Sequence, residues 1–147
     1  MQKPVCNAYL DNAATTPVID EAIEAMNDVL RHAWGNPSSP HRVGSVAKEV
    51  LEQSRATIAE CLGVDADEVF FTSGATEANN LAVRGACMAR KDESRRIVTS
   101  SLEHASVTRS IRGMRREGWD VEHIEDVAGD FDMGQLHSAL LKPTTLI

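Results

Sequence analysis

The chain of 147 residues has no long apolar run, few cysteines and a shortage of positive charge, and each absence excludes a class of protein. No stretch approaches the ~20 apolar residues of a membrane-spanning helix. The first six residues lack the apolar core of a signal peptide. The net charge of -7, without any basic stripe, argues against nucleic acid as the main partner. With 42% hydrophobic residues, the composition favours one ordinary globular domain.

The cysteines are too few and too widely spaced for a disulfide framework or a zinc site. Cys6, Cys61 and Cys87 are odd in number and contain no C-x-x-C pair. This usage is typical of a protein in the reducing cytoplasm, and it predicts no metal site. Cys61 and Cys87 fall on apolar stripes of predicted helices, so we expect both thiols to be buried.

Two common phosphate-binding motifs are also missing, because the chain has neither G-x-x-x-x-G-K-[ST] nor G-x-G-x-x-G after a strand. Internal repeats and low-complexity segments are absent as well. One cluster of arginines, at positions 109, 112, 115 and 116, follows a single helical pattern. A solvated helix face is the favoured interpretation of that cluster.

What the chain does contain is an alternation of helix and strand patterns, which predicts a layered α/β domain. Helices are expected from about residue 20, over 43–62, over 75–90, over 104–117 and from 132 to about 141. Strands are expected at 9–10, 68–72, 96–100 and 119–124, and another begins at 143. The segment 35–40 is too rich in Gly, Asn, Pro and Ser for regular structure.

The last five residues begin a strand pattern and the sequence stops there. A strand with no turn or polar tail after it presents unpaired backbone groups and an apolar edge. The pattern alone fits two interpretations equally well: a domain whose last strand finishes at Ile147, and a piece of a longer protein.

The segment 70–80, FFTSGATEANN, is the most informative in the chain. An apolar run breaks at Ser73-Gly74 and opens at once into a helical pattern. Such a junction leaves several backbone N–H groups free and directs the positive end of the helix dipole at one point, which suits a phosphate group. An ordinary turn that needs glycine for its backbone freedom fits the same pattern. Glu77 would repel a phosphate, so we expect its carboxylate to face elsewhere.

His104 follows the strand at 96–100 through a short loop. In a parallel sheet the loops at the carboxyl ends of strands form the ligand crevice, so His104 is expected at the same edge as Ser73. A histidine there can stack on a flat cofactor or move a proton near neutral pH. The alternative is a histidine that only begins a helix and bonds its own backbone.

Four segments together closely resemble the start of cysteine desulfurases of the NifS/IscS type, which are class V aminotransferases. They are YLDNAATTP at 9–17, GNPSS at 35–39 followed by His41, FTSGATEANN at 71–80, and Glu103-His104. The resemblance runs from Tyr9 to Ile147. It implies an α/β fold with three α/β/α layers, a partial large domain of the pyridoxal-phosphate-dependent transferase (aspartate aminotransferase-like) fold. It also implies that 1–147 is the N-terminal part of such a domain, truncated.

The resemblance assigns roles to particular residues. Ala75 and Thr76 correspond to the phosphate-binding pair of pyridoxal 5'-phosphate, through backbone N–H groups and the Thr76 hydroxyl. His104 corresponds to the residue that stacks over the pyridine ring and moves a proton, as a catalytic and cofactor-binding residue. Ala13 and Ala14 correspond to part of the substrate entrance, where small side chains leave room for an amino acid.

The resemblance also shows which reacting groups are missing. The family uses a lysine that bonds the cofactor as a Schiff base, an aspartate on the pyridine nitrogen and a mobile nucleophilic cysteine. None of the lysines stands in a Ser-x-His-Lys setting; they are Lys3, Lys48, Lys91 and Lys142. The loop 36–41 is implied to lie near the site, with no role for any one side chain.

The implied function is the conversion of L-cysteine to alanine with transfer of sulfur to an acceptor protein, for iron–sulfur cluster assembly or thiolation. Relatives of this type are homodimers in the cytoplasm. A selenocysteine lyase or another class V enzyme is the first alternative, and a non-enzymatic remnant or interaction module is the second. Whether the chain is an enzyme by itself stays open at this point. We expect it to be inactive and poorly soluble alone, with no membrane or nucleic-acid partner.

Overall fold

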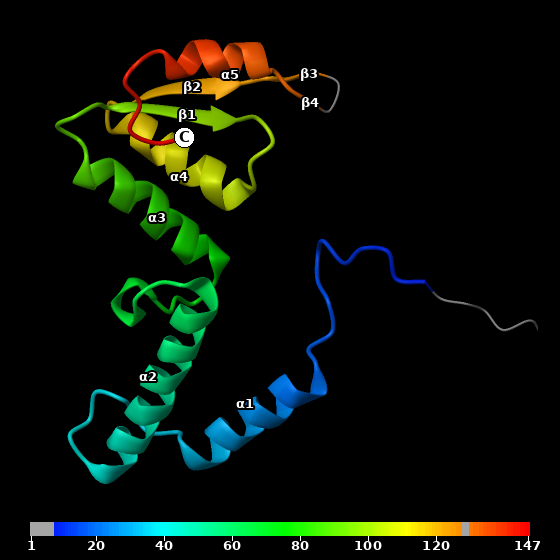
Figure 1. Cartoon of the computed structure of the whole chain (residues 1–147), viewed down its shortest axis with the longest axis vertical. Helices are drawn as coiled ribbons and strands as arrows, with labels where there is room; N and C mark the ends of the chain where they lie inside the picture. The colour runs from blue at the N-terminus through cyan, green and yellow to red at the C-terminus, as the bar shows by residue number, and fades with distance from the viewer. Residues whose placement is uncertain (1–7, 128–129) are drawn as a thin grey trace, which may run out of the picture. The chain divides into compact units, whose positions relative to one another are not determined.

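The computed structural model describes residues 8–127 and 130–147, and the chain divides into two compact units. The first unit is Met1–Phe70 and the second is Phe71–Ile147. The predictions for Cys6 and its neighbours therefore lie outside the described residues. Helices and strands follow the order α1, α2, a short 3-10 helix η1, α3, β1, α4, β2, β3, β4 and α5. Figure 1 labels the helices and strands along the chain.

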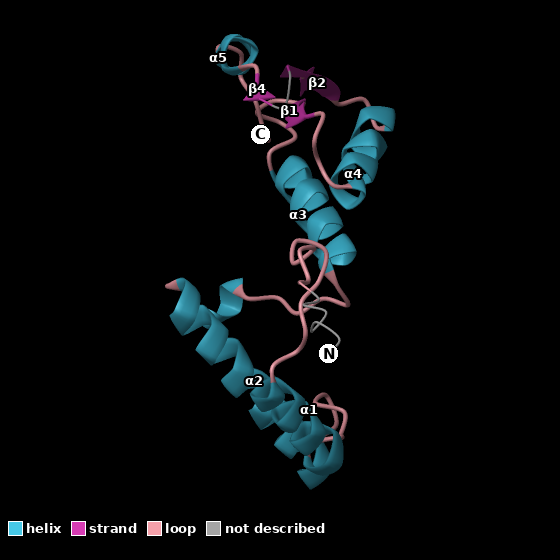
Figure 2. Cartoon of the chain, turned by 90° about the vertical axis from the view of Figure 1, so that its right-hand side faces the viewer, coloured by secondary structure: helices cyan, strands magenta, loops and turns pink. Residues whose placement is uncertain are grey.

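In the described part of the first unit there are only helices and loops, as the colouring of Figure 2 shows. Helix α1, Asp20–His32, begins where the acidic pair at its first turn predicts. None of its residues is buried, and its apolar face, which includes Met26, is exposed to solvent. The strand expected at 9–10 is not formed. Instead the Tyr9 hydroxyl donates to the carbonyl oxygens of Asp11 and Thr15, at 2.9 and 3.1 Å.

Helix α2, Arg42–Leu62, confirms the clearest helical pattern of the sequence. The His41 Nδ1 atom accepts from the Gly44 amide at its start, and Gly63 ends it with φ +68°. The expectation that Cys61 is buried is wrong, because the thiol is exposed. Only Gly44 and two alanines of α2 are buried.

The strand expected at 68–72 is also wrong. Residues Ala66–Glu68 form the 3-10 helix η1, and 69–72 run on without regular structure. A strand requires a neighbour to accept its backbone hydrogen bonds, and none of the described segments pairs with this one. Phe70 is consequently 72% exposed.

The second unit is built on a parallel sheet with β1 in the middle. Strand β1, Arg96–Ser100, pairs in parallel with β2, Asp120–Ile124, with Ile97 opposite Val121. On the other edge of β1, Leu146 forms a parallel bridge with Ile97, and its carbonyl accepts from the Val98 amide at 2.9 Å. The strand expected from 143 is formed only as this one-residue bridge at Leu146.

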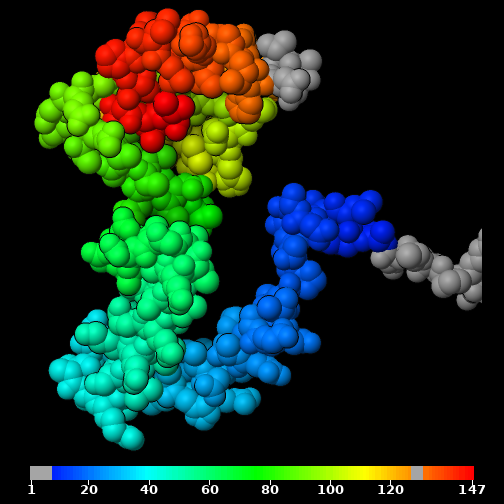
Figure 3. Space-filling model, viewed as in Figure 1, coloured from blue at the N-terminus to red at the C-terminus, as the bar shows by residue number. Residues whose placement is uncertain are grey.

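Helices cover both faces of this sheet, which gives the predicted three layers. Helices α3, Ala75–Ala89, and α4, Ala105–Arg116, form one core with Ile97. Helix α5, Met133–Leu140, packs on the opposite face against Val98 and Ile124. Figure 1 shows α4 and α5 on opposite sides of β1 and β2. In the space-filling view of Figure 3, the C-terminal residues lie directly against α5.

Three further details complete the description of the second unit. Cys87 and Val83 form the buried side of α3, whereas the small residues Ala82 and Gly85 are exposed. A hairpin not expected from the sequence, β3 Asp126–Val127 with β4 Asp130–Phe131, precedes α5. Asp132 caps α5 by accepting from the Gln135 amide, and the Gln135 side chain bonds the backbone of His123 and Glu125.

Arg96 joins the layers of the second unit. This side chain is buried, with 6% exposed. Its Nη1 atom donates to the Ala139 carbonyl of α5 and to the Thr144 hydroxyl, each at 2.7 Å. Its Nη2 atom pairs with the carboxylate of Glu122 on β2. A charge buried this deeply is tolerated because a carboxylate, a carbonyl oxygen and a hydroxyl oxygen accept its hydrogen bonds.

Candidate functional site

The predicted phosphate turn lies at the start of α3. Gly74 is the residue before the helix, and its carbonyl accepts the first helical hydrogen bond from the Ala78 amide at 3.1 Å. The amides of Ala75 and Thr76 therefore precede the hydrogen-bond ladder of the helix. Within the described residues nothing accepts from these two amides, and both residues are exposed. The turn thus presents open donors at the positive end of a helix dipole.

The Glu77 carboxylate binds both donors of Ser73, the residue that precedes Gly74. One carboxylate oxygen accepts from the Ser73 hydroxyl at 2.6 Å and from the Ser73 amide at 2.7 Å. The bond from the Ser73 hydroxyl, followed by that from the amide, lowers the pKa of Glu77 below its ordinary value. The carboxylate is thus held on Ser73, and the Ala75 and Thr76 amides are left open.

His104 caps helix α4. Its Nδ1 atom accepts from the Ser106 amide at 3.1 Å and lies 2.8 Å from the Ser106 hydroxyl oxygen. This is the backbone-bonded histidine that the sequence allowed as an alternative. The cap uses only Nδ1, however, and the imidazole is exposed. In the part of the chain that the structure describes, Nε2 has no partner, so the same ring is available to a ligand.

A hydrogen-bond network joins His104 to the helix of the phosphate turn. The Ser106 hydroxyl oxygen accepts from the Asn79 side-chain amide of α3 at 2.7 Å. Asn79 lies three residues after Thr76, on the same side of the helix. Neither Asn79 nor Ser106 was predicted from the sequence to have a role in the site. The only signal was a serine two residues after a helix-starting histidine.

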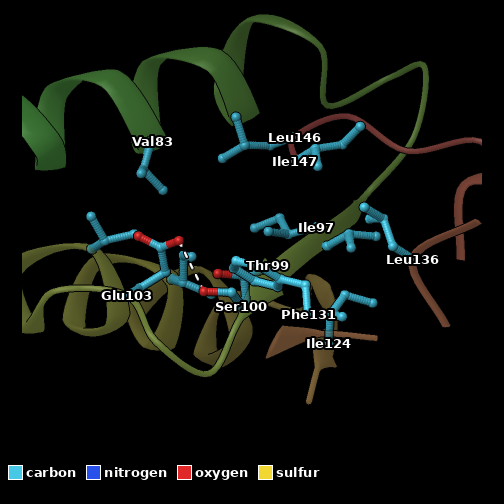
Figure 4. A pocket seen from close by; sticks show the side chains of 13 residues that line it. Val83, Ile97, Thr99, Ser100, Glu103, Ile124, Phe131, Leu136, Leu146 and Ile147 are labelled. Carbon is cyan, nitrogen blue, oxygen red and sulfur yellow. Dashed lines mark hydrogen bonds between the residues drawn. The ribbon is translucent and has the colours of Figure 1, made fainter. Parts of the chain in front are cut away.

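An apolar pocket of the second unit lies apart from these residues. It measures about 290 Å³, and none of the predicted site residues lines it. Figure 4 shows Leu146 and Ile147 above Ile97, and Glu103 accepting from the Ser100 hydroxyl at 3.1 Å. A wall of apolar groups with a carboxylate suits no phosphate, so the exposed turn is the better candidate site.

The predicted substrate-entrance residues belong to the first unit, whereas Ala75 and His104 belong to the second. Ala13 and Ala14 are exposed, in a turn where the Ala14 amide donates to the Asp11 carbonyl at 3.0 Å. The loop 36–41 packs closely on the start of α2. A methyl group on Gly44 would lie 2.3 Å from the Ser39 carbonyl oxygen.

Metal binding and membrane insertion find no support in the described residues. Over 8–127 and 130–147, no three His, Cys, Asp or Glu side chains gather as metal ligands. Across the same ranges, no helix combines the length and apolar content needed to cross a bilayer.

Comparisons with known proteins agree on one family. The family model described as aminotransferase class-V matches residues 8–147. A NifS/IcsS protein homolog of Lactobacillus delbrueckii subsp. bulgaricus is 42% identical over 95% of this chain and 36% of its own length. Cysteine desulfurase IscS of Dictyoglomus turgidum is 39% identical over the same shares, 95% and 36%.

The solved structures that resemble this chain include a NifS-like protein as well. A structure described as SspA in complex with cysteine superposes with a TM-score of 0.78 and 32% identity, over 96% of this chain and 40% of that one. A NifS-like protein superposes with a TM-score of 0.71 and 34% identity, over 77% of this chain and 31% of that one. The chain spans little more than a third of the length of the curated relatives, 36% of each of the two named above.

Proposed function

The chain belongs to the aminotransferase class-V family, and we propose that it is the N-terminal part of a pyridoxal-phosphate-dependent cysteine desulfurase. The whole enzyme would take sulfur from L-cysteine, leave alanine, and pass the sulfur to an acceptor protein for iron–sulfur cluster assembly or thiolation. Support comes from relatives named cysteine desulfurase and from a similar structure described as a complex with cysteine. The scattered cysteines favour a cytoplasmic location.

One observation carries the proposal: two open amides and an exposed histidine ring belong to one hydrogen-bonded framework. The Ala75 and Thr76 amides have no acceptor among the described residues, and the network through Asn79 and Ser106 connects their helix to His104. A hydrogen bond to a charged group contributes roughly 1.5–3 kcal/mol. The turn therefore fits the phosphate end of the cofactor.

Each residue has a separate task in this proposal. The Ala75 amide, with the amide and hydroxyl of Thr76, binds the phosphate and fixes one end of the cofactor. His104 covers the flat ring, and its Nε2–H group faces outward from the cap as a proton donor. When bound, pyridoxal phosphate supplies the electron sink that weakens bonds to the substrate's α-carbon.

The reacting groups of such an enzyme would come from outside residues 1–147. Lys48, Lys91 and Lys142 lie outside any Ser-x-His-Lys setting, and no cysteine matches a nucleophile loop. We therefore propose that the chain alone binds the cofactor phosphate without turnover. The complete protein would be a homodimer, and Ala13 and Ala14 would line its substrate entrance.

The sharpest test removes one donor and preserves the helix. Ala75 is the first residue of α3, a position where proline is tolerated because its missing N–H has no helical partner. Ala75→Pro should weaken binding of inorganic phosphate and of pyridoxal phosphate by about tenfold or more, as expected for one lost charged hydrogen bond. Binding is followed by the amide NMR signal of Thr76.

Met133→Pro is the matched control, because Met133 is the first residue of α5 in the same unit. It should leave phosphate binding unchanged. Equal binding by wild type and Ala75→Pro, or a Thr76 signal that phosphate does not move, would contradict the site. Separately, the chain supplied with pyridoxal phosphate and L-cysteine should form no alanine, and alanine formation would contradict the proposed lack of turnover.

A further inference from the structure

We propose that Asn79 and Ser106 are positioning residues for His104, which hold its imidazole in the tautomer with hydrogen on Nε2 and tie the ring to the phosphate turn. This inference rests on the proposed function for its ligand, but its geometry stands on the hydrogen bonds alone. Those bonds link Asn79 to Ser106 at 2.7 Å, and Ser106 to His104 at 2.8 and 3.1 Å.

The tautomer follows from counting hydrogens. A backbone N–H can only donate, so the Ser106 amide requires a lone pair on the His104 Nδ1 atom. The neutral ring must then carry its hydrogen on Nε2. The exposed side of the ring is therefore a donor in its neutral form.

The Ser106 hydroxyl further favours the tautomer of His104 with its hydrogen on Nε2. It has one hydrogen, and it can give that hydrogen to Nδ1 only if its other neighbour donates to it. Asn79 does so through its NH2 group. Ser106 is only 4% exposed, so water does not compete for these bonds.

The network also fixes where the ring lies. Asn79 belongs to α3, one turn beyond Thr76, and His104 begins α4. The two helices pack on the same core, so a bond between their side chains links two rigid elements. The ring is thereby held at a set place relative to the open amides. A cofactor gripped at its phosphate would meet a ring that is already oriented.

The next residue of the sequence provides a matched comparison. Asn80 donates to the Thr76 carbonyl at 2.8 Å, inside its own helix, and makes no bond to Ser106 or His104. Asn79→Asp and Asn80→Asp therefore add the same charge to neighbouring positions. Only the first replaces a donor that Ser106 needs.

The first measurement is the ring nitrogen spectrum of His104 in the whole chain without any ligand. In wild type, Nδ1 should give the signal of an unprotonated nitrogen and Nε2 that of a protonated one. In Asn79→Asp the new carboxylate takes the Ser106 hydrogen, so Nδ1 keeps only the bond from the Ser106 amide, and its signal should shift as that of a nitrogen that has lost one hydrogen bond. Asn80→Asp should keep the wild-type pattern. A hydrogen on Nδ1 in wild type, or equal shifts in both variants, would overturn the proposal.

Ser106→Ala provides a second variant, since it removes the hydroxyl without adding charge. Ser110→Ala is its control, because the Ser110 hydroxyl is buried on the same helix without a partner among the described residues. Ser106→Ala should shift the His104 ring signals, and Ser110→Ala should not. A ring spectrum that neither variant changes would count against the network.

The second measurement separates this proposal from the proposed function. Two ligands are compared: inorganic phosphate, and pyridoxine 5'-phosphate, which adds the ring but has no aldehyde. The ratio of the affinity for pyridoxine 5'-phosphate to that for inorganic phosphate measures the gain from the ring. Asn79→Asp should lower this gain several-fold relative to Asn80→Asp. An unchanged gain would overturn the positioning role. If wild type binds neither ligand, the proposed function fails, while the ring spectra still decide the tautomer.

Discussion

The two units of this chain differ in how much apolar surface they bury. In the second unit, Ile97 and Met114 have no exposed area, because helices cover both faces of a parallel sheet. In the first unit, α1 has no buried residue, and Trp34 is 71% exposed. Both units contain regular helices. The difference shows that amphipathic helices form a core only where a sheet or another helix covers their apolar face.

The two tryptophans make this comparison measurable. Trp119 is 5% exposed in the core of the second unit, and Trp34 lies in the first. A Trp34→Phe variant leaves Trp119 as the reporter of the second unit, and Trp119→Phe leaves Trp34 as the reporter of the first.

The largest effect is expected from Met114→Ala. The Met114 side chain has no exposed area in the core formed by α3, α4 and β1. Its loss should lower the free energy of unfolding of the second unit by roughly 3 kcal/mol, through lost burial and a new cavity. Met26→Ala, at a methionine that is 61% exposed in α1, should change stability by about 0.5 kcal/mol or less. Urea unfolding followed by fluorescence measures both, and equal effects would break the comparison.

The second largest difference is expected between the labelling rates of Cys87 and Cys61. Cys87 is fully buried, and burial raises the pKa of its thiol, so little reactive thiolate is present. Cys61 is exposed in the first unit. In a Cys6→Ser background, Cys87 should react at least about a hundredfold more slowly with a thiol reagent, which corresponds to about 2.7 kcal/mol of opening free energy. Similar rates at pH 8 would mean that the second unit opens as readily as the first.

Gly44→Ala probes the tightest packing of the first unit. A methyl group there would lie 2.3 Å from the Ser39 carbonyl and 2.7 Å from the Asn36 carbonyl. The substitution should destabilise the start of α2 by about 1–3 kcal/mol, as for other overpacked sites. Gly85→Ala, in open space on α3, should instead stabilise by up to about 1 kcal/mol. Circular dichroism during urea unfolding reports both. If Gly44→Ala leaves the free energy of unfolding unchanged, the loop 36–41 can move aside to make room for the methyl group.

The smallest expected effect is the change with pH in the stability of the start of α3. Hydrogen bonds from Ser73 lower the pKa of Glu77, so its stabilising contribution is complete above the ordinary glutamate pKa of about 4.3 and is lost as pH falls through the lowered value. Carboxyl NMR should show the pKa of Glu77 below the ordinary range of a glutamate side chain. Ser73→Ala should raise the Glu77 pKa, and no change would contradict the role of the hydroxyl bond.

Most of the second unit could be predicted from the sequence, because its helices and strands find their packing partners within Phe71–Ile147. The strand at 96–100 and the helix that His104 caps appear at their predicted places. The failures share one cause. The strand at 68–72 and the burial of Cys61 both required a partner surface, and a periodic pattern shows which face is apolar without showing what covers it.

The candidate site likewise contains features that a single segment predicts and features that depend on packing between segments. The open amides of Ala75 and Thr76 follow from the position of Gly74 alone, since every helix start leaves such donors. Asn79 and Ser106 come together only when α3 packs beside α4. A contact between residues so far apart in sequence has no local signature, so reasoning from single segments could not predict it.

The central position of β1 has a consequence for the order of folding. Its partner Val121 is about half as far along the chain from Ile97 as Leu146 is. Closing a loop twice as long costs about 0.6 kcal/mol more, and β2 also leaves the ribosome earlier. Strand β1 therefore gains its second neighbour last. Until then one of its edges lacks a partner, and an unpaired strand edge can pair with another chain and aggregate.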